Sequence, residues 1–417
     1  MSVLSLATEK CPVCGRAHTC PIRYVHVGEG ALLRLPEVTE GYDRLLIVAD
    51  ENTFEAAGAE AVLLLGDKVR KSVVFSGDVL LVPDEAAVAA VEGRLDGIDM
   101  IVGVGSGVIQ DLCKYVSHRA GLPYIVIATA PSMDGYASDG AAMILGGMKV
   151  TVPSGLPYAL VADTAVLAAA PAEMIRAGYG DIVGKYSALS DWRLANLVTG
   201  EYFCPVLHDE TLAIVERTVA ASPAIASRSR EAVGLLAEAL IDVGFLMSYV
   251  GSSRPASGSE HHLSHFFEIT GIVKGRDYLP HGIDVACSTV VTTALRERLL
   301  AATWERRPLP TAEERRDAIT RIYGSVAEGC LALQDKAGSY RSDRVPLYLE
   351  REAEIRTLLS EVPSSERILA LLREAGISME EFYSLYGEDT LRDAVAYAKD
   401  LKDRYTVLWL AYELGIS

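Results

Sequence analysis

Four of the eight histidines fall between residues 261 and 281, and an aspartate in a glycine-rich segment precedes them. The histidines stand in Ser259-Glu-His261-His262-Leu-Ser-His265 and Leu279-Pro-His281-Gly282, and the aspartate in Gly178-Tyr-Gly180-Asp181. Carboxylate and imidazole ligands suit a divalent ion such as zinc, nickel or ferrous iron. Three protein ligands would leave coordination positions open, as catalytic sites require. The alternative is a helix-capping aspartate with polar surface histidines, which the clustering makes the weaker interpretation.

The adjacent histidines pose a question of spacing. His261 and His265 share one face of a helix at i, i+4, whereas His262 and His265 give an i, i+3 pair. Neighbouring side chains on a helix point about 100° apart, so His261 and His262 do not both face one ion. The spacing alone leaves both pairs open.

A second candidate site is the glycine-rich turn Gly103-Val-Gly105-Ser-Gly107 between an expected strand and an expected helix. Such a turn brings backbone N–H groups and a helix N-terminus to a pyrophosphate. The turn departs from the dinucleotide pattern G-x-G-x-x-G, because Gln110 stands where the last glycine belongs. On its own it fits a tight turn without a ligand equally well. Asp50, at the end of an earlier strand, suits either a ribose hydroxyl or a helix start.

The segment from Thr129 to Ser138 places hydroxyls, a carboxylate and a glycine directly after another expected strand. Ligands of open parallel sheets bind beyond the carboxyl ends of the strands. This position favours a ligand-binding loop over an ordinary polar turn.

The elements that would position these residues change character along the chain. Short apolar runs predict strands at 44–50, 71–75, 98–104, 124–128 and 159–162, with helical patterns between most of them. Strands alternating with helices predict a Rossmann-like parallel sheet. After about residue 163 only helical patterns follow. We therefore expect an α/β dinucleotide-binding domain over 1–163 and an all-α metal- and substrate-binding domain over 164–417.

Composition excludes several classes of protein. The 417 residues carry 39 Lys+Arg against 56 Asp+Glu, a formal charge of −17, which argues against nucleic-acid binding. No apolar run approaches the roughly 18 residues of a membrane span. The start MSVLSLATEK lacks the basic and apolar regions of a signal peptide. Seven cysteines are sparse for this length, which indicates a reducing cytoplasm.

The N-terminal segment Cys11-x-x-Cys14-x-x-x-His18-x-Cys20 contains four thiol and imidazole groups. Cys₃His is an accepted ligand set for structural zinc, but the spacing is tighter than in most zinc ribbons or fingers. Unligated thiols are the other interpretation. We leave these residues out of the predicted metal site.

Together these segments resemble the sn-glycerol-1-phosphate dehydrogenase family, in its bacterial, AraM-like branch. That family belongs to the iron-containing alcohol dehydrogenase and dehydroquinate synthase-like superfamily. The resemblance is carried by GVGSGVIQD (103–111), TAPSMDGYAS (129–138), GYGDIVGKYSALSDWRLA (178–195), SRPASGSEHHLSH (253–265) and LPHG (279–282).

The resemblance implies metal-dependent, reversible reduction of dihydroxyacetone phosphate to sn-glycerol 1-phosphate with NAD(P)H, by a homodimer. It implies that Asp181, His261 and His281 bind one divalent ion. Asp134, Asp181 and His265 would contact substrate, with Asp181 and His265 serving catalysis. The implied cofactor residues are Asp50, Gly105, Ser106, Gly107, Val108, Ile109, Thr129, Ala130, Pro131, Ser132 and Ser138.

Two rival functions remain open. A superfamily member could instead eliminate phosphate and form a carbocycle, which would return the NAD cofactor unchanged. The chain could also bind metal or nucleotide without catalysis. For the substrate phosphate, Lys185 and Arg254 are the candidate cations beside the metal motifs.

Overall fold

The computed structural model describes residues 3–79, 81–146 and 148–416. The chain divides into two compact units. Unit 1 comprises Met1–Cys11, Gly15–Tyr179 and Pro223–Gly251, and unit 2 comprises Pro12–Cys14, Gly180–Ser222 and Ser252–Ser417. The units do not coincide with the expected division at 163/164, because residues 164–179 and 223–251 belong to unit 1.

Unit 1 contains a six-stranded parallel sheet in the order β1-β8-β5-β4-β2-β3. Its strands are β1 (Tyr24–Gly28), β2 (Leu45–Asp50), β3 (Val69–Phe75), β4 (Met100–Gly105), β5 (Tyr124–Ala128) and β8 (Ala159–Asp163). The central strands β4, β5 and β8 are buried along their whole length, as expected for strands covered on both faces. The predicted parallel α/β region is confirmed.

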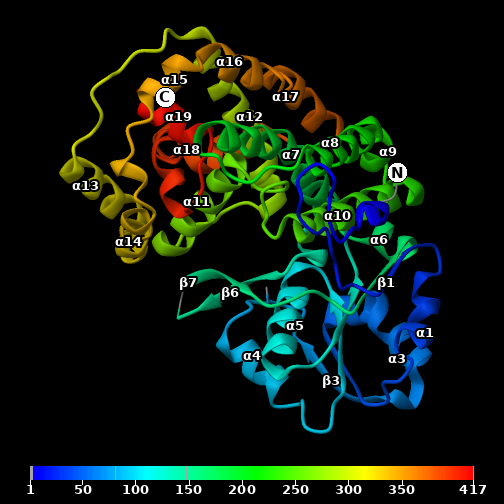
Figure 1. The fold of residues 1–417 in the computed structure, drawn as a ribbon. Coiled ribbons are helices and arrows are strands. Elements are labelled where there is room, and N and C mark those ends of the chain that lie inside the picture. Colours follow the sequence, from blue (N-terminus) through cyan, green and yellow to red (C-terminus); the bar gives the residue numbers. More distant parts are fainter. Residues whose placement is uncertain (1–2, 80, 147, 417) are drawn as a thin grey trace. The chain divides into compact units, whose positions relative to one another are not determined.

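The order in which successive strands are added to this sheet reverses at β2. From β2 the chain runs outward to β3, returns past β2 to β4, and continues to β5 on the other side. Right-handed crossovers that run in opposite directions lie on opposite faces. Accordingly α1 and α3 pack on one face, while α4 and α5 lie together on the other (Figure 1). The carboxyl ends of β2 and β4 therefore border the point at which open sheets bind ligands.

Two elements were absent from the sequence prediction. The edge strand β1 is half-buried at every position, so its sequence YVHVG lacks the long apolar run of a central strand. The antiparallel hairpin of β6 (Gly140–Leu145) and β7 (Met148–Pro153) was also not predicted. Its sequence signal is the Gly-Gly pair at 146–147, which is typical of a hairpin turn.

Helices surround the sheet and complete unit 1. They are α1 (Leu35–Val38), α2 (Glu51–Thr53), α3 (Ala59–Leu65), α4 (Glu85–Glu92), α5 (Gly107–Ala120), α6 (Thr164–Ala169), α9 (Ser222–Ala226) and α10 (Arg230–Val250). One helix among the described residues, α10, has the length and mean hydropathy of a membrane span, although Glu238 and Asp242 interrupt its apolar sequence. In the structure 78% of its apolar window is buried, and α10 packs against α6 and β1 as a core helix.

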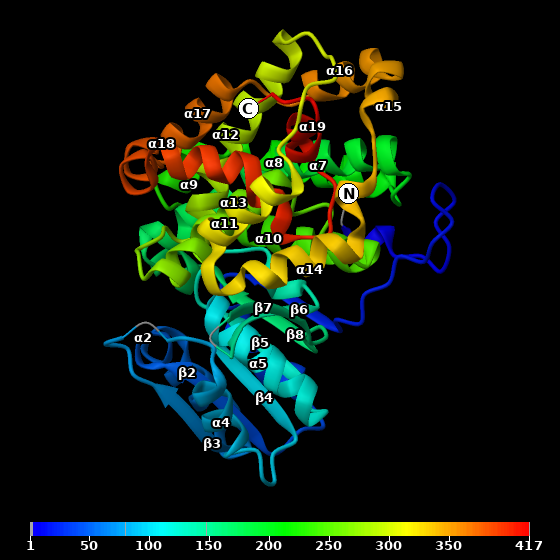
Figure 2. The ribbon, with the colours of Figure 1, turned by 90° about the vertical axis from the view of Figure 1, so that its left-hand side faces the viewer.

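The described residues of unit 2 form helices and no strands, which confirms the predicted all-α region (Figure 2). The helices are α7 (Ala172–Thr199, whose first turns belong to unit 1), α8 (Pro205–Ala220), α11 (Ser259–Lys274), α12 (His281–Ala301), α13 (Ala312–Tyr323), α14 (Ala327–Ala337), α15 (Val345–Glu350), α16 (Glu352–Ser360), α17 (Ser365–Glu374), α18 (Met379–Tyr397) and α19 (Val407–Glu413). Helix α12 contacts α11, α16, α17, α18 and α19, so it forms the core of the unit.

Short 3₁₀ or π turns connect these elements. They are η1 (Val3–Leu6), η2 (Ala31–Arg34), η3 (Phe54–Gly58), η4 (Gly66–Lys68), η5 (Gly135–Ala137), η6 (Gly324–Val326), η7 (Ser339–Arg341) and η8 (Ala398–Leu401).

Candidate active site

Glycines allow helices α7 and α12 to approach each other within backbone contact. A Cβ atom at Gly180 would lie 2.4 Å from the carbonyl oxygen of Gly282, and one at Gly184 would lie 2.5 Å from Cγ1 of Val285. Both distances are far below the usual carbon contact of about 3.5–4.0 Å. Because Asp181 follows Gly180, this approach brings its carboxylate to the first turn of α12, where His281 lies.

Three side chains of unit 2 gather at this place. The carboxylate of Asp181 and the imidazoles of His261 and His281 offer ligand atoms that all lie within 4.8 Å of one another. Nε2 of His261 is 3.6 Å from Oδ1 of Asp181. Asp181 and His261 are buried, and His281 is half-buried. One carboxylate and two imidazoles are a donor set that fits a divalent transition metal.

The second ring nitrogens of both histidines have polar partners. Nδ1 of His261 is 2.7 Å from Oε1 of Glu260, and Nδ1 of His281 is 3.2 Å from the hydroxyl of Ser264. Partners of this kind fix the orientation of metal-binding imidazoles. Burial, together with the charge of Lys185, holds the pKa of His261 well below its usual range. The ring is therefore neutral at pH 7, which is the form that donates a lone pair to a metal.

The structure distinguishes the neighbouring histidines of α11. His261 belongs to the group with Asp181 and His281, and His262 does not. The ring of His262 is fully buried, and burial holds its pKa well below the usual range. His265 lies one turn after His261, with its ring centre 5.6 Å from that of His281. His265 is half-buried, so it borders the group from a more accessible position.

The two candidate cations for the substrate phosphate have other partners. Nζ of Lys185 lies 2.5 Å from Oδ1 of Asp181, and both side chains are buried. The guanidinium of Arg254 binds both carboxylate oxygens of Glu201 and donates to the carbonyl of Tyr405 at 2.9 Å. Lys185 therefore holds the Asp181 carboxylate in place, and Arg254 serves as a structural cation.

In unit 1 the glycine-rich turn joins the end of β4 to the start of α5. Ser106 caps α5 with φ −97° and ψ −154°, a conformation that any L residue adopts, so serine at this position costs no backbone strain. Its side chain makes no capping hydrogen bond. A Cβ at Gly105 would lie 2.6 Å from Ile109, whereas one at Gly107 would meet only Met133, at 3.5 Å. The helix N-terminus thus suits a diphosphate group.

Gln110, which departs from the dinucleotide pattern, connects the strand ends beneath this turn. Its buried Nε2 lies 3.1 Å from the carbonyl of Gly103, 3.0 Å from that of Gly105 and 3.3 Å from that of Ile127. These are carbonyls near the carboxyl ends of β4 and β5. Sequence reasoning treated Gln110 only as a mismatch, although a glutamine on the buried side of a helix must find such partners.

The loop after β5 contains the remaining candidates of unit 1, which are Thr129, Ala130, Pro131, Ser132, Asp134 and Ser138. The N–H of Thr129 donates to the carbonyl of Gly105 at 3.3 Å, which brings this loop next to the glycine-rich turn. The buried Lys114, one turn after Gln110, donates to the carbonyls of Gly135 and Gly140 at 2.9 Å each. Sequence reasoning missed Lys114 as a residue that shapes the loop. A lysine among the apolar residues on one side of an amphipathic helix was the available signal.

Asp50 ends β2 and caps α2. Its Oδ1 accepts from the N–H of Thr53 at 2.8 Å, and its own N–H donates to the Thr53 hydroxyl at 3.0 Å. The side chain is half-buried. The structure thus shows Asp50 at the start of a helix, as one of the two interpretations predicts. Asp50 also lies beside the point where the strand order of the sheet reverses, so a ribose contact stays a proposal.

Comparisons with known proteins identify the class of this fold. A family model described as iron-containing alcohol dehydrogenase matches residues 26–171. The structure resembles that of the iron-containing alcohol dehydrogenase from Thermococcus thioreducens, with TM-score 0.62 and 16% identity, covering 94% of this chain and 99% of that one. It also resembles a 1,3-propanediol oxidoreductase, with TM-score 0.63 and 16% identity, covering 94% and 97%. The chain therefore has the fold of the iron-containing alcohol dehydrogenases.

Relatives of higher identity define the family more closely. A glycerol-1-phosphate dehydrogenase [NAD(P)+] from Bacillus licheniformis is 30% identical over 414 residues, which cover 97% of this chain and 92% of the relative. One from Halalkalibacterium halodurans is 31% identical, covering 96% and 95%. The chain belongs to the glycerol-1-phosphate dehydrogenase family, as its motifs predict.

The packing of α7 on α12 can be tested by adding a single methyl group. In Gly180→Ala the new Cβ must displace the backbone of Gly282, so we expect the free energy of unfolding to fall by about 1–3 kcal/mol. Metal affinity should fall as well, since Asp181 and His281 move apart. Thermal denaturation and metal titration measure the two effects.

Gly329→Ala is the matched control in the same unit. A Cβ at Gly329, within α14, meets nothing within 4 Å. In a helix interior this change should be neutral or stabilise by up to about 1 kcal/mol. Equal stability and metal affinity of the two variants would contradict the proposed role of the α7–α12 contact.

Proposed function

We propose that this protein catalyses the reversible NAD(P)H-dependent reduction of dihydroxyacetone phosphate to sn-glycerol 1-phosphate. The observation that carries the proposal is the buried group of Asp181, His261 and His281, in a chain of the glycerol-1-phosphate dehydrogenase family. The reaction adds a hydride to the ketone carbon and a proton to its oxygen, so the site must accommodate negative charge growing on that oxygen.

The side chains of unit 2 supply the metal site in this proposal. Asp181, His261 and His281 would hold one divalent ion, which when bound polarises the ketone oxygen, while the nucleotide supplies the hydride. Lys185 holds the Asp181 carboxylate, and Glu260 and Ser264 hold the two imidazoles. Zinc, nickel and ferrous iron all accept this donor set.

Substrate positioning and proton transfer involve two further residues. His265, beside His281, would orient the substrate or deliver the proton that completes the alcohol. Asp134, in the loop after β5, would bind a substrate hydroxyl. Both assignments rest on the match of this chain to the motifs of its family.

The cofactor would bind to unit 1. The N–H groups in the first turn of α5 would bind the diphosphate, with Gly107 leaving room for it. Val108 and Ile109 in the same turn, and the loop from Thr129 to Ser138, would line the cofactor. Asp50 would accept a hydrogen bond from the adenosine ribose. A homodimer and a cytoplasmic location stay predictions.

The activity itself is the first test. Purified protein should oxidise one NADH for each dihydroxyacetone phosphate, and the product should be sn-glycerol 1-phosphate by a stereospecific assay. A chelator should abolish turnover, and adding back zinc, nickel or ferrous iron one at a time identifies the metal. Phosphate release without net NADH oxidation would instead indicate the carbocycle-forming reaction.

Two neighbouring histidines provide a matched pair of variants. His261→Ala should lose bound metal and lower kcat by more than about a hundredfold, since losing a ligand costs more than losing the partner of a ligand. His262→Ala should keep metal and most activity. Only its free energy of unfolding should fall, because the change leaves a cavity. Metal analysis, kinetics and thermal denaturation separate these effects. The opposite pattern would assign the metal to His262.

Cofactor choice tests the place of Asp50. Asp50→Asn removes the charge but keeps an N-cap of similar quality. If the carboxylate faces the ribose, the ratio of kcat/KM for NADPH to that for NADH should rise about tenfold, because a like charge near the 2′-phosphate is gone.

Asp84 gives a control with the same local role. Its Oδ1 caps α4 by accepting from the N–H of Ala87 at 2.9 Å. Asp84→Asn should leave the NADPH preference unchanged. The same ratio in both variants would place Asp50 away from the ribose.

A further inference from the structure

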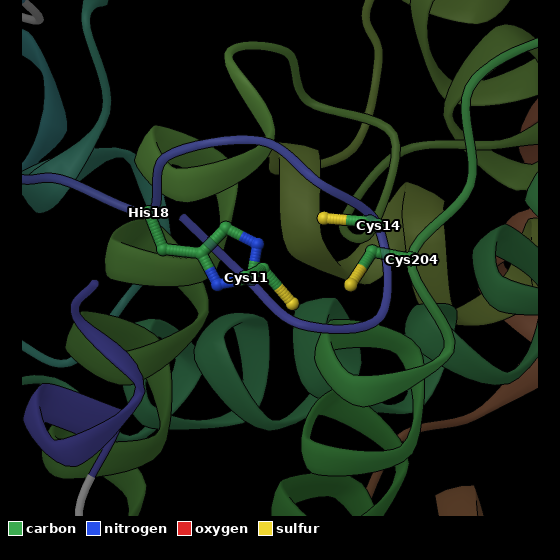
Figure 3. A group of neighbouring side chains, drawn as sticks. All are labelled: Cys11, Cys14, His18 and Cys204. Atoms are coloured by element: carbon green, nitrogen blue, oxygen red, sulfur yellow. The ribbon is translucent and has the colours of Figure 1, made fainter. Parts of the chain in front are cut away.

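A second group of metal-ligating side chains lies outside the candidate active site, in the N-terminal segment and before α8. Cys11, Cys14, His18 and Cys204 offer ligand atoms that all lie within 4.8 Å of one another. Figure 3 shows the three sulfur atoms together on one side of the His18 ring. Cys11, His18 and Cys204 are buried, and Cys14 is half-buried. We refer to these four residues as the Cys₃His cluster.

A short closed loop carries three members of the cluster. The N–H of Cys11 donates to the carbonyl of Arg16 at 2.8 Å, and the N–H of Gly15 donates to the carbonyl of Cys11 at 2.9 Å. Gly15 has φ +74°, a conformation that glycine adopts without strain. Thr8 and His18 exchange two backbone hydrogen bonds, of 3.0 and 2.8 Å, at the base of the loop. The backbone alone therefore returns His18 to the side of the two cysteines.

The fourth member comes from a distant part of the chain, at a well-fixed position. Cys204 is the N-cap of α8, and its side chain makes no capping hydrogen bond to the helix. The segment before it is held by the buried Trp192, whose Nε1 donates to the carbonyl of Tyr202 at 2.7 Å. A helix N-terminus favours a thiolate over a thiol, because the helix dipole is positive there.

Two more contacts favour the protonation state and orientation that metal binding by the cluster requires. The hydroxyl of Tyr202 donates to Sγ of Cys14 at 3.2 Å, a bond that favours the thiolate form. The ring of His18 stacks on Tyr249, with ring centres 5.8 Å apart and planes 16° from parallel, which fixes the plane of the imidazole. Thiolates and a neutral imidazole are the forms that bind zinc.

We propose that Cys11, Cys14, His18 and Cys204 bind a structural zinc ion. Four protein ligands close a tetrahedral site, in contrast to the open set of Asp181, His261 and His281. Ligand atoms around tetrahedral zinc lie roughly 3.5–3.8 Å apart, so the observed spacing needs only small inward shifts. Binding would release the thiol protons and fasten residues 12–14 to the start of α8 within unit 2.

This assignment corrects the ligand set that the sequence suggested. In the zinc interpretation of the N-terminal motif, which we left out of the predicted metal site, Cys20 was the third sulfur, but the structure groups Cys204 with the other three residues and leaves Cys20 outside. Burial raises the pKa of Cys20, whose thiol has a partner in Ser248. The unusually tight spacing of the N-terminal motif follows, because that motif supplies only three of the four ligands.

Cobalt substitution tests the proposal on the intact chain. The predicted ligands of the active-site metal, Asp181, His261 and His281, contain no sulfur, so a thiolate-to-cobalt charge-transfer band in the reduced, Co²⁺-loaded protein reports the Cys₃His cluster. We expect this band, together with the strong visible absorption of tetrahedral cobalt, and expect one equivalent of zinc to abolish both. Absence of the band would overturn the proposal, whatever the activity of the enzyme.

Metal counting in variants tests the ligand set. In the His261→Ala/His281→Ala background, which removes two ligands of the other site, protein from zinc-supplemented cells should retain one zinc per chain. Adding Cys204→Ser should remove that zinc and lower the Tm, whereas adding Cys20→Ser, the matched control, should leave both unchanged.

Three outcomes of the metal counting would overturn the proposal. They are zinc-free protein before any cysteine is changed, bound iron in place of zinc, and loss of zinc in Cys20→Ser but not in Cys204→Ser. The last would restore the ligand set suggested by the sequence.

Discussion

The backbone contact between α7 and α12 is the constraint on which the candidate active site depends. Gly180 admits the carbonyl of Gly282, and no other residue type leaves room for it. Through this contact Asp181 reaches the first residue of α12, His281, and α12 in turn packs against α11, which carries His261. The three ligands come from three helices, so their proximity is a property of helix packing and not of any local motif. The ion pair of Lys185 and Asp181 is buried in the same place, where each charge offsets the cost of burying the other.

In unit 1 a few buried side chains donate hydrogen bonds to carbonyls at the ends of strands. Strand ends leave backbone carbonyls without sheet partners, and buried carbonyls need donors. Gln110 and Lys114, on one face of α5, supply them to the ends of β4 and β5 and to the loop beyond. With these donors directed into the protein, the uncapped first turn of α5 keeps its N–H groups for a ligand. The helix thus shapes the loop with its buried side chains, and its uncapped backbone N–H groups suit the proposed anion site.

The sequence predicted the parts of the structure that a local pattern encodes. Central strands such as β5 are continuous apolar runs, and the glycine-rich turn between β4 and α5 is recognisable from its sequence. The half-buried edge strand β1 lacks such a run. The choice between His261 and His262 was open because the spacing of the histidines on α11 does not show which face of that helix lies toward Asp181 of α7 and His281 of α12. Likewise, no spacing rule could join Cys204 to Cys11, because only the folded chain brings α8 to the N-terminal loop.

Charge connects these observations to the substrate class. A formal charge of −17 opposes an anionic ligand, so a phosphorylated substrate and a dinucleotide both need local positive potential. Lys185 and Arg254 are each matched by a carboxylate, and therefore add little net charge to attract a phosphate. In unit 2 the Asp181–Lys185 pair is neutral overall, and the imidazole of His261 is neutral as well. A divalent ion held there would add positive charge to the site, offset in part by the Glu260 carboxylate that holds His261. In unit 1 the corresponding contribution comes from the uncapped N-terminus of α5, whose partial positive charge is fixed by the backbone. In the proposed function, positive potential for the two anions would thus come from a metal ion and a helix dipole, which would let an acidic chain bind acidic ligands.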